Sequence, residues 1–460
     1  MTHALVLGGS VAGLLAARTL SDFYGSVTVV ERDDLREGPF DRRAVPQGRH
    51  AHGLLLRGAL ALDELLPGFL GELVDRGANV VDGTDLSHLY FCMGGHLAVR
   101  YGTSERMKTY SATRPFIEDL VRRRVRAIPN VTFVTNHDVA QLTASAGGDR
   151  ITGARIVDRA NQDTSDVGAV LVVDAMGRGS RTPVMLGHLG FPAAPEERVT
   201  IDVVYRTQRL RVSPASLTER VVVVSPVPGR PTGLAMAASE HDTWMFTAFG
   251  MAGVEPPRDF SGLCDFAGEL LPTHVVTALR GAQRVGDIAS HRFPASRWRR
   301  YDRTRLPGGF VVIGDAFCSF NPIYGQGMTV AAMHALALRD CLSSGAHDIA
   351  RRFFRTAGKP TRLAWRTAVG ADLALPEIEG TPPLSTRLFN RYVDRVLTAA
   401  EHDVAAYERF VRVAWLVDPA LSLLSPTMVW RTVMANRRRP VNMTIDPAAT
   451  REQRTLADGL

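Results

Sequence analysis

A strand, a glycine-containing turn and a helix open this chain, and they restrict its fold more than any other feature. Residues 3–9 form a short apolar run, and residues 10–25 place Leu14, Ala17 and Leu20 on one side of a helix. Residues 26–31 form a second apolar run, so the chain starts with a βαβ unit. Because βαβ units join parallel strands, the sequence predicts an α/β (α+β) protein with a Rossmann-like domain.

The turn of this unit has the pattern Gly8-x-Ser10-x-x-Gly13. Small residues there let backbone amides approach a pyrophosphate at the helix N-terminus, where the helix dipole favours an anion. Glu31 ends the second strand, about where a carboxylate takes the ribose hydroxyls. The sequence therefore predicts a dinucleotide site, although Ser10 replaces the second glycine of the usual fingerprint. A tight turn without a ligand is the alternative, and the turn does not separate NAD from FAD.

The stretch GDAFCSFNPIYGQGM at residues 314–328 separates these two cofactors. An apolar run delivers Asp315 to the end of a predicted strand, and Gly325 and Gly327 precede a predicted helix that begins near Met328. An NAD domain is one continuous unit, whereas this stretch returns some 300 residues later with groups suited to a flavin. Asp315 can accept hydrogen bonds from ribityl hydroxyls, and helix amides can face the flavin edge that gains negative charge on reduction. The sequence predicts FAD.

Six segments follow one another along the chain: GGSVAG, Glu31-Arg32, RRAVPQGRHAH, TRPFIEDL, VVDAMGRGSR and VVIGDAFCSFNPIYGQGM. In these motifs the chain resembles the FAD-dependent monooxygenases of the p-hydroxybenzoate hydroxylase fold, over roughly residues 1–345. RRAVPQGRHAHGLL and NPIYGQGM are most similar to the bacterial olefin epoxidases of polyether biosynthesis. These motifs are specific for fold and cofactor and much less specific for substrate.

The resemblance implies a role for each cofactor residue. Arg43 would reach the FAD phosphates, and Arg114, at the start of a predicted helix, would be another contact. A surface salt bridge is the alternative for both arginines. The implied FAD-binding set is Gly8, Ser10, Gly13, Glu31, Arg32, Arg43, Arg114, Gly314, Asp315, Gly325, Gly327 and Met328.

The middle motif departs from the family pattern. Hydroxylases of this fold often carry Ala-Asp-Gly here, which serves FAD and NADPH together, whereas this chain has Ala175-Met176-Gly177 with Asp174 one place early. FAD binding tolerates this change. The departure leaves two routes for electrons, which are transient NAD(P)H docking or a separate flavin reductase.

Beyond the first cofactor segment, the patterns predict four parts. Alternating apolar runs predict an antiparallel sheet that stands over the flavin as a substrate layer, and long amphipathic stretches predict C-terminal helices. The predicted parts are 1–185 and 285–345 for the FAD-binding domain, 186–284 for the substrate sheet, with residues 85–105 a candidate to join it, and 346–460 for the helical region, whose last 20 residues form a loose tail.

Composition excludes several classes of protein. The net charge is +7, yet no aromatic platform or DNA-binding motif accompanies the basic clusters, so nucleic acid is not expected as a partner. No uninterrupted apolar run reaches about 18 residues, so no membrane span is expected. The first residues lack a basic n-region, which argues against a signal peptide and for the cytoplasm. The four cysteines lack metal-ligand spacing and are expected to be reduced thiols.

These features predict an FAD-dependent monooxygenase that inserts one oxygen atom from O₂ into a small hydrophobic secondary metabolite, by epoxidation or hydroxylation, through a flavin C4a-hydroperoxide. An epoxidase needs no protein base, whereas a phenol hydroxylase does. No catalytic residue is assigned. The candidates for a base, each more often structural, are His88, His96, Tyr205, His241 and Tyr324.

Three other functions stay open. A flavin halogenase would need a lysine in the cofactor domain, where Lys108 is the only one, and the chain has no WxWxIP stretch. A flavin-dependent reductase of polyprenyl chains would not consume oxygen in its reaction. A flavin-binding carrier or regulator would show no turnover.

Overall fold

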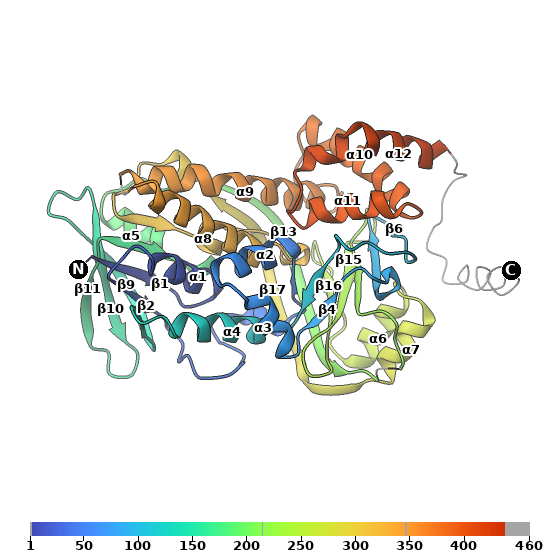
Figure 1. The fold of residues 1–460 in the computed structure, drawn as a ribbon, viewed down its shortest axis with the longest axis horizontal. Helices are drawn as coiled ribbons and strands as arrows, with labels where there is room; N and C mark the ends of the chain where they lie inside the picture. The colour runs from blue at the N-terminus through green and yellow to red at the C-terminus, as the bar shows by residue number, and fades with distance from the viewer. Residues whose placement is uncertain (1, 214, 346, 438–460) are drawn as a thin grey trace, which may run out of the picture.

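The structure is a computed structural model, and it describes residues 2–213, 215–345 and 347–437. A five-stranded parallel sheet forms the core of one lobe, in the order β18-β12-β1-β2-β8 (Figure 1). Helices α1, α4 and α8 pack side by side on it, and a three-stranded antiparallel sheet packs on it as well. Its strands are mostly apolar because parallel sheets are buried on both faces. The elements are β1 (His3–Leu7), α1 (Val11–Leu20), β2 (Ser26–Val30), α4 (Arg114–Arg126), β8 (Val131–Val134), β9 (His137–Ala144), β10 (Ile151–Asp158), β11 (Thr164–Gly168), β12 (Leu171–Asp174), α5 (Thr182–His188), β18 (Phe310–Val312) and α8 (Gly327–Ser343).

A large sheet of eight strands builds the second lobe, in the order β19-β17-β13-β16-β15-β14-β5-β6. Along β16, Trp244 and Phe246 belong to the core beneath α6 and α7, whereas Thr247 and Phe249 line a cavity. This two-residue alternation gives the sheet one face for its own core and one face for a ligand. Its elements are β5 (Leu89–Met93), β6 (His96–Leu97), β13 (Glu196–Arg211), β14 (Val221–Val224), β15 (Thr232–Ala238), β16 (Thr243–Gly250), α6 (Phe260–Gly268), α7 (Thr273–Arg280), β17 (Gln283–Arg299) and β19 (Cys318–Ser319).

Three segments enter this sheet from outside residues 186–284, and one of them is β19, which pairs with β17. The β5–β6 hairpin joins the edge because β5 pairs with β14 in parallel. Strand β17 pairs along β13 as far as Arg299, so the sheet extends beyond residue 284. A small sheet and two helices complete the fold, and α2 packs against α8 of the first lobe. Their elements are β3 (Gly53–Leu54), α2 (Leu56–Leu65), α3 (Phe69–Asp75), β4 (Asn79–Val81) and β7 (Thr109–Ser111).

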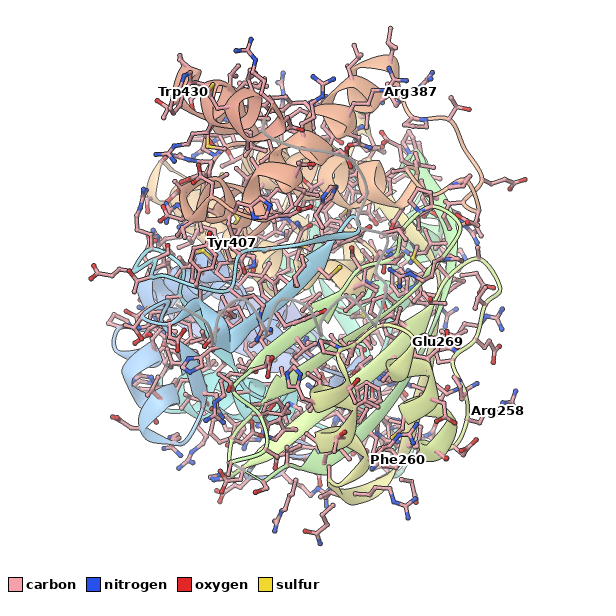
Figure 2. All side chains as sticks on the ribbon, turned by 90° about the vertical axis from the view of Figure 1, so that its right-hand side faces the viewer. Arg258, Phe260, Glu269, Arg387, Tyr407 and Trp430 are labelled. Carbon is pink, nitrogen blue, oxygen red and sulfur yellow. The ribbon has the colours of Figure 1, made fainter. Side chains whose placement is uncertain are left out.

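Helix α9 packs beside α8 on the first lobe, and helices α10, α11 and α12 form a helical cap over the second lobe (Figure 1). Tyr407 is buried against Phe91 of β5, with ring centroids 6.4 Å apart. Figure 2 shows Tyr407 on the side of this helical cap that faces the sheet, whereas Arg387 and Trp430 lie on its outer side. The helices are α9 (Ile349–Asp372), α10 (Leu384–Ala400), α11 (Val404–Ala414) and α12 (Pro426–Arg437).

The predicted fold class is confirmed, because a Rossmann-like parallel sheet, antiparallel sheets and C-terminal helices are all present. The predicted loose tail at residues 441–460 lies outside the described residues. None of the described helices has both the length and the apolar character that crossing a bilayer requires. All four cysteines are buried and have free thiols.

Candidate functional site

A cavity of about 2010 Å³ lies where the parallel sheet, the large sheet and the helical cap meet. The first turn of the βαβ unit, the middle motif and residues 314–328 all contribute to its lining. In open α/β sheets, ligands bind beyond the carboxyl ends of the strands. The cavity occupies that position, because β1 and β12 end at residues that lead directly into its wall.

At two positions of the first turn, the surrounding backbone leaves no room for a side chain, so only glycine fits. Gly8 has a φ of +105°, and a Cβ there would lie 2.5 Å from the carbonyl oxygen of Ala175. A Cβ on Gly13 would lie 1.8 Å from the carbonyl oxygen of Gly8. Ser10 precedes α1 without capping it, and its hydroxyl donates instead to Glu118 Oε2 at 3.0 Å. The amides of the first turn of α1 therefore remain available to an anion in the cavity.

Glu31 belongs to a buried cluster of charges beside this turn. Its carboxylate accepts hydrogen bonds from the Gly9 amide at 2.7 Å and the Asp33 amide at 2.9 Å. Arg42 pairs with Glu31 at 2.6 Å and also with Glu118. Burial opposes the charge of Arg42, but Glu118 and Glu31 outweigh it and raise its pKa. The cluster holds the carboxylate of Glu31 at the end of β2, beside the glycine turn.

The four arginines of this region take different positions. Arg42 is buried and lines the cavity, whereas its neighbour Arg43 is exposed and does not line it. Arg114 lines the cavity and donates from Nη2 to the Ser10 hydroxyl at 3.0 Å. Arg32 also lines the cavity, with its side chain 57% exposed and paired with Asp138 at 3.4 Å. Arg32 and Arg114 thus both line the cavity, and Arg43 does not.

Gly314 brings the second cofactor segment against the first. Its φ is +59°, and a Cβ there would lie 2.8 Å from the Cβ of Ala12. Its amide donates to Nδ1 of the buried His334 at 3.1 Å, and Nε2 of that ring then donates to Thr361 at 2.8 Å. Burial lowers the pKa of His334 to about 3, so the ring stays neutral and can accept this hydrogen bond.

Asp315 faces the cavity and has no hydrogen-bond partner among the described residues. Burial raises the pKa of this carboxyl, and the nearby Arg114 and Arg178 oppose that shift. A carboxylate that the protein surrounds but leaves unpaired is suited to accept hydrogen bonds from a ligand. This is the group that the sequence assigns to the ribityl chain.

The loop after Asp315 directs the start of α8 toward the cavity. Gly325 has a φ of +66° and ends a short 3₁₀ helix at Pro322–Tyr324. Helix α8 begins at Gly327 without a side-chain cap, and Gly325, Gly327 and Met328 all line the cavity. The residues present therefore fit FAD, since two uncapped helix N-termini, a glycine cradle and an unpaired carboxylate surround one cavity.

The middle motif has its aspartate turned away from the cavity. Asp174 is buried and does not line it, and it accepts hydrogen bonds from the Met176 amide at 2.9 Å and the Ser180 hydroxyl at 2.5 Å. Burial raises the pKa of this carboxyl, and these hydrogen bonds oppose the shift. Met176 and Arg178 line the cavity instead.

Two of the candidate bases meet at a buried polar network. Tyr205 donates to Asn321 Oδ1 at 3.3 Å, and Tyr324 donates to Asp372 Oδ1 at 2.8 Å. Asn321 Nδ2 also donates to Asp372 at 2.8 Å, so the aspartate at the end of α9 ties this loop together. Burial raises the pKa of Asp372 to about 7, and hydrogen bonds from Asn321 and Tyr324 oppose the shift.

The other three candidate bases do not line the cavity. His96 lies between Asp394 at 3.1 Å and Glu401 at 2.7 Å. His88 lies 3.9 Å from Asp85, and His241 packs edge-on against Phe116 with ring centroids 6.0 Å apart. Their contacts give each of them a structural role.

The far end of the cavity is apolar, with a few histidines. Strands of the large sheet and helices of the cap provide Phe91, Val223, Ala235, Phe249, Phe293 and Phe410. His50 and His52 line the cavity as well, and His52 lies near Arg114. Burial lowers the pKa of His50 to about 3 and that of His52 to about 4, so both rings are neutral near pH 7. This end suits a hydrophobic molecule with few polar groups.

Sequence reasoning missed four residues that shape the site: Arg42, His50, Glu118 and Asp372. Glu118 could have been found, because it lies one helical turn after Arg114. Arg42 is adjacent to the predicted Arg43, and only burial distinguishes them. Nothing near Asp372 in the sequence signals its contact with residues 321–324, which lie some fifty positions earlier.

Two relatives extend over most of the chain. Protein Rv3254 of Mycobacterium tuberculosis is 37% identical over 449 residues, which cover 95% of this chain and 94% of that protein. A kynurenine 3-monooxygenase of Salinispora arenicola is 30% identical over 400 residues, which cover 82% of this chain and 79% of that protein. No family model matches the chain.

Solved structures share the fold. The flavin-dependent brominase Bmp2 has a TM-score of 0.65 at 13% identity and covers 95% of this chain and 100% of its own. The p-nitrophenol 4-monooxygenase PnpA of Pseudomonas putida has a TM-score of 0.60 at 15% identity, with coverages of 91% and 100%. At these identities the structures establish a common fold alone.

Proposed function

The chain belongs to the FAD-dependent monooxygenases of the p-hydroxybenzoate hydroxylase fold, and from this premise we propose that it transfers one oxygen atom from O₂ to a small hydrophobic molecule. The observation that carries the proposal is one cavity with two different ends. Asp315 and the glycine turns suit a flavin at one end, and the aromatic and aliphatic walls suit an apolar substrate at the other.

Bound FAD supplies the oxygen-activating chemistry, and the protein supplies binding, orientation and exclusion of water. Asp315, which lines the cavity, would hold the ribityl chain, and the amides at the uncapped start of α8 would stabilise the flavin edge. Phe249 and Phe293 line the substrate end and keep water from it. Arg43 is exposed, so its proposed contact with the FAD phosphates requires its side chain to turn toward the bound cofactor.

Epoxidation of an olefin is the first form of this proposal. His50 and His52 are neutral weak bases in the cavity, because burial keeps their pKa values at about 3 and about 4. Such groups do not take a proton from a phenol near pH 7. The motifs shared with the polyether-type epoxidases support the same form. Hydroxylation is the second form, and the Tyr324–Asp372 pair favours it, because Asp372 has a pKa of about 7 and can accept a proton.

Electrons come from NAD(P)H, directly or through a separate flavin reductase. Met176 lines the cavity where many relatives carry an aspartate, so we expect slow direct reduction in the absence of substrate. Arg303, Arg362 and Arg366 also line the cavity and are exposed, and they have no ion-pair partner among the described residues. They suit a transient anionic donor. Anaerobic mixing with NADH or NADPH, with and without an added flavin reductase, measures each route by loss of flavin absorbance.

A halogenase is a weaker candidate, because Lys108 does not line the cavity and lies 5.4 Å from the Tyr110 ring centroid. A polyprenyl reductase remains a candidate because the apolar end would also accept a long chain. Buried free thiols suit the cytoplasm, which we propose as the working compartment.

The test uses purified protein with FAD, reductant and isotopically labelled O₂. The substrates are a panel of olefins, phenols and terpenoids, together with kynurenine because of the relative of that name. We expect a product heavier by one labelled oxygen atom, and an epoxide or an alcohol separates the two forms. Saturation of a double bond without labelled oxygen would establish the reductase instead. Asp315→Ala serves as the cofactor-deficient control.

A further inference from the structure

His50 carries a buried hydrogen-bonding atom without a partner, at the wall of the cavity. The residue is 5% exposed and lines the cavity, and its Nε2 is buried and has no partner among the described residues. A buried polar nitrogen without a partner is unfavourable, and such atoms in a cavity indicate where a ligand provides the missing group. The ring centroid of His50 lies 5.5 Å from that of Tyr205, and the ring centroid of Tyr205 lies 6.0 Å from that of Phe249. The histidine is therefore close to the apolar residues of the cavity wall.

A chain of hydrogen bonds determines which ring nitrogen carries the proton. The Ala51 amide donates to Thr247 Oγ1 at 2.9 Å, the hydroxyls of Thr247 and Thr207 lie 2.7 Å apart, and Thr207 lies 2.7 Å from His50 Nδ1. In one order, the Thr247 hydroxyl donates to Thr207 and the Thr207 hydroxyl donates to His50 Nδ1, so both hydroxyl protons have an acceptor. The reverse order leaves the Thr247 proton without an acceptor among the described residues. The network therefore assigns the proton to Nε2.

The ring is a neutral donor over the physiological range. Burial, and to a smaller extent the nearby His291, His52 and Arg49, lower the pKa of His50 to about 3. The imidazole neither attracts an anion as a cation nor serves as a strong base. The imidazole therefore supplies a neutral N–H group at a fixed place in the cavity wall, and such a group suits a neutral oxygen acceptor.

We propose that His50 Nε2–H donates a hydrogen bond to an oxygen atom of the substrate. The enzyme then selects apolar molecules that carry a carbonyl, ether or hydroxyl oxygen over hydrocarbons of the same shape. The bond also orients the molecule, because Thr207 and Thr247 hold the donor in one direction. This inference rests on the proposed function, since it takes the apolar end as the place where the molecule to be oxidised binds.

A matched pair of ligands tests the donor in the oxidised holoenzyme. The ketone 2-acetylnaphthalene and the olefin 2-isopropenylnaphthalene have the same shape and differ by one oxygen acceptor. In equilibrium dialysis we expect the ketone to bind about threefold to tenfold more tightly than the olefin, as for one neutral hydrogen bond. His50→Phe removes this preference, and His50→Gln, which keeps a donor, restores part of it. His291→Phe, with its ring 5.8 Å from His50, keeps the preference.

The carbonyl stretch of the bound ketone gives a readout that a purely structural role would not move. It shifts to lower frequency in the wild-type protein and stays unshifted in His50→Phe. Nitrogen NMR of the imidazole is expected to show protonated Nε2 in the wild type and a mixed state in Thr207→Val. Each variant is compared with the wild type by FAD content and circular dichroism.

Four results would overturn the proposal: equal affinities for the two ligands, no binding of either, a protonated Nδ1, or a ketone preference that survives His50→Phe. If His50→Phe alters the flavin spectrum and leaves the preference intact, the N–H belongs to the cofactor. No turnover or O₂ enters these measurements. Failure of the oxygenation assay and failure of this inference are therefore distinguished.

Discussion

The two ends of the cavity are built in different ways. The cofactor end uses short segments in which glycines and a carboxylate have fixed places, such as Gly8 to Gly13 and Gly314 to Asp315. The substrate end takes single residues from strands and helices that are far apart in the chain, such as Phe91 and Phe410. The cofactor end therefore depends on local backbone geometry, whereas the substrate end depends on how the large sheet packs against the helical cap.

Substituting a glycine of the cofactor turn is expected to have the largest effect. Gly13→Ala places a Cβ 1.8 Å from a carbonyl oxygen of the same turn. We expect a loss of stability of about 3 kcal/mol or more, at the upper end of overpacking costs, together with loss of FAD binding. Gly358→Ala is the matched control, because it also lies in a helix and its Cβ meets nothing within 4 Å. Thermal unfolding and FAD titration measure both, and equal behaviour of the two variants would contradict the claim about local geometry.

Substituting the adjacent Arg42 and Arg43 one at a time distinguishes an effect on stability from an effect on cofactor binding. Arg42→Ala leaves Glu31 and Glu118 buried without their partner, so we expect a loss of about 3–5 kcal/mol in unfolding free energy. Arg43→Ala changes an exposed side chain, so stability should change by less than about 0.5 kcal/mol. If Arg43 contacts the phosphates, as proposed, its removal weakens FAD binding alone. Urea unfolding of the apo-protein and FAD titration give the two quantities separately.

Asp315→Ala tests the carboxylate that faces the cavity. A hydrogen bond to a charged group contributes about 1.5–3 kcal/mol, so FAD affinity should fall about tenfold or more. The apo-protein should remain folded, since no described residue hydrogen-bonds to this carboxylate. Asp340→Ala, on the exposed side of α8, is the control. Full flavin occupancy of Asp315→Ala at limiting FAD would rule out the ribityl contact.

Asp372→Asn is expected to change how stability depends on pH. An unfolded aspartate has a pKa of about 3.9, whereas burial raises that of Asp372 to about 7. Between these values the folded state holds more protons than the unfolded state, so the contribution of Asp372 to stability falls as the pH rises. The amide variant should lose this dependence. Unfolding midpoints at about pH 5 and about pH 8 measure this pH dependence. The same change in midpoint between the two pH values for wild type and variant would contradict the raised pKa.

The order of motifs determined the fold class, the cofactor class and the family, because each depends on short segments. Gly8, Gly13 and Asp315 are recognisable in sequence because a tight turn or a strand end admits few residue types. Arg42 and Arg43 show the limit of this reasoning. They are the same residue type at adjacent positions, and only the packed structure shows that one is buried and the other exposed.

The substrate end was decided by the tertiary structure. Asp372 meets Asn321 and Tyr324 only because α9 returns across the loop before α8. His50 becomes a fixed donor only because Thr207 and Thr247 lie opposite each other on paired strands. No local pattern encodes such contacts, since they join segments that are remote in sequence and they take their geometry from the packing of the whole core. The sequence by itself determined the cofactor turns, and the tertiary structure decided which side chains face the substrate.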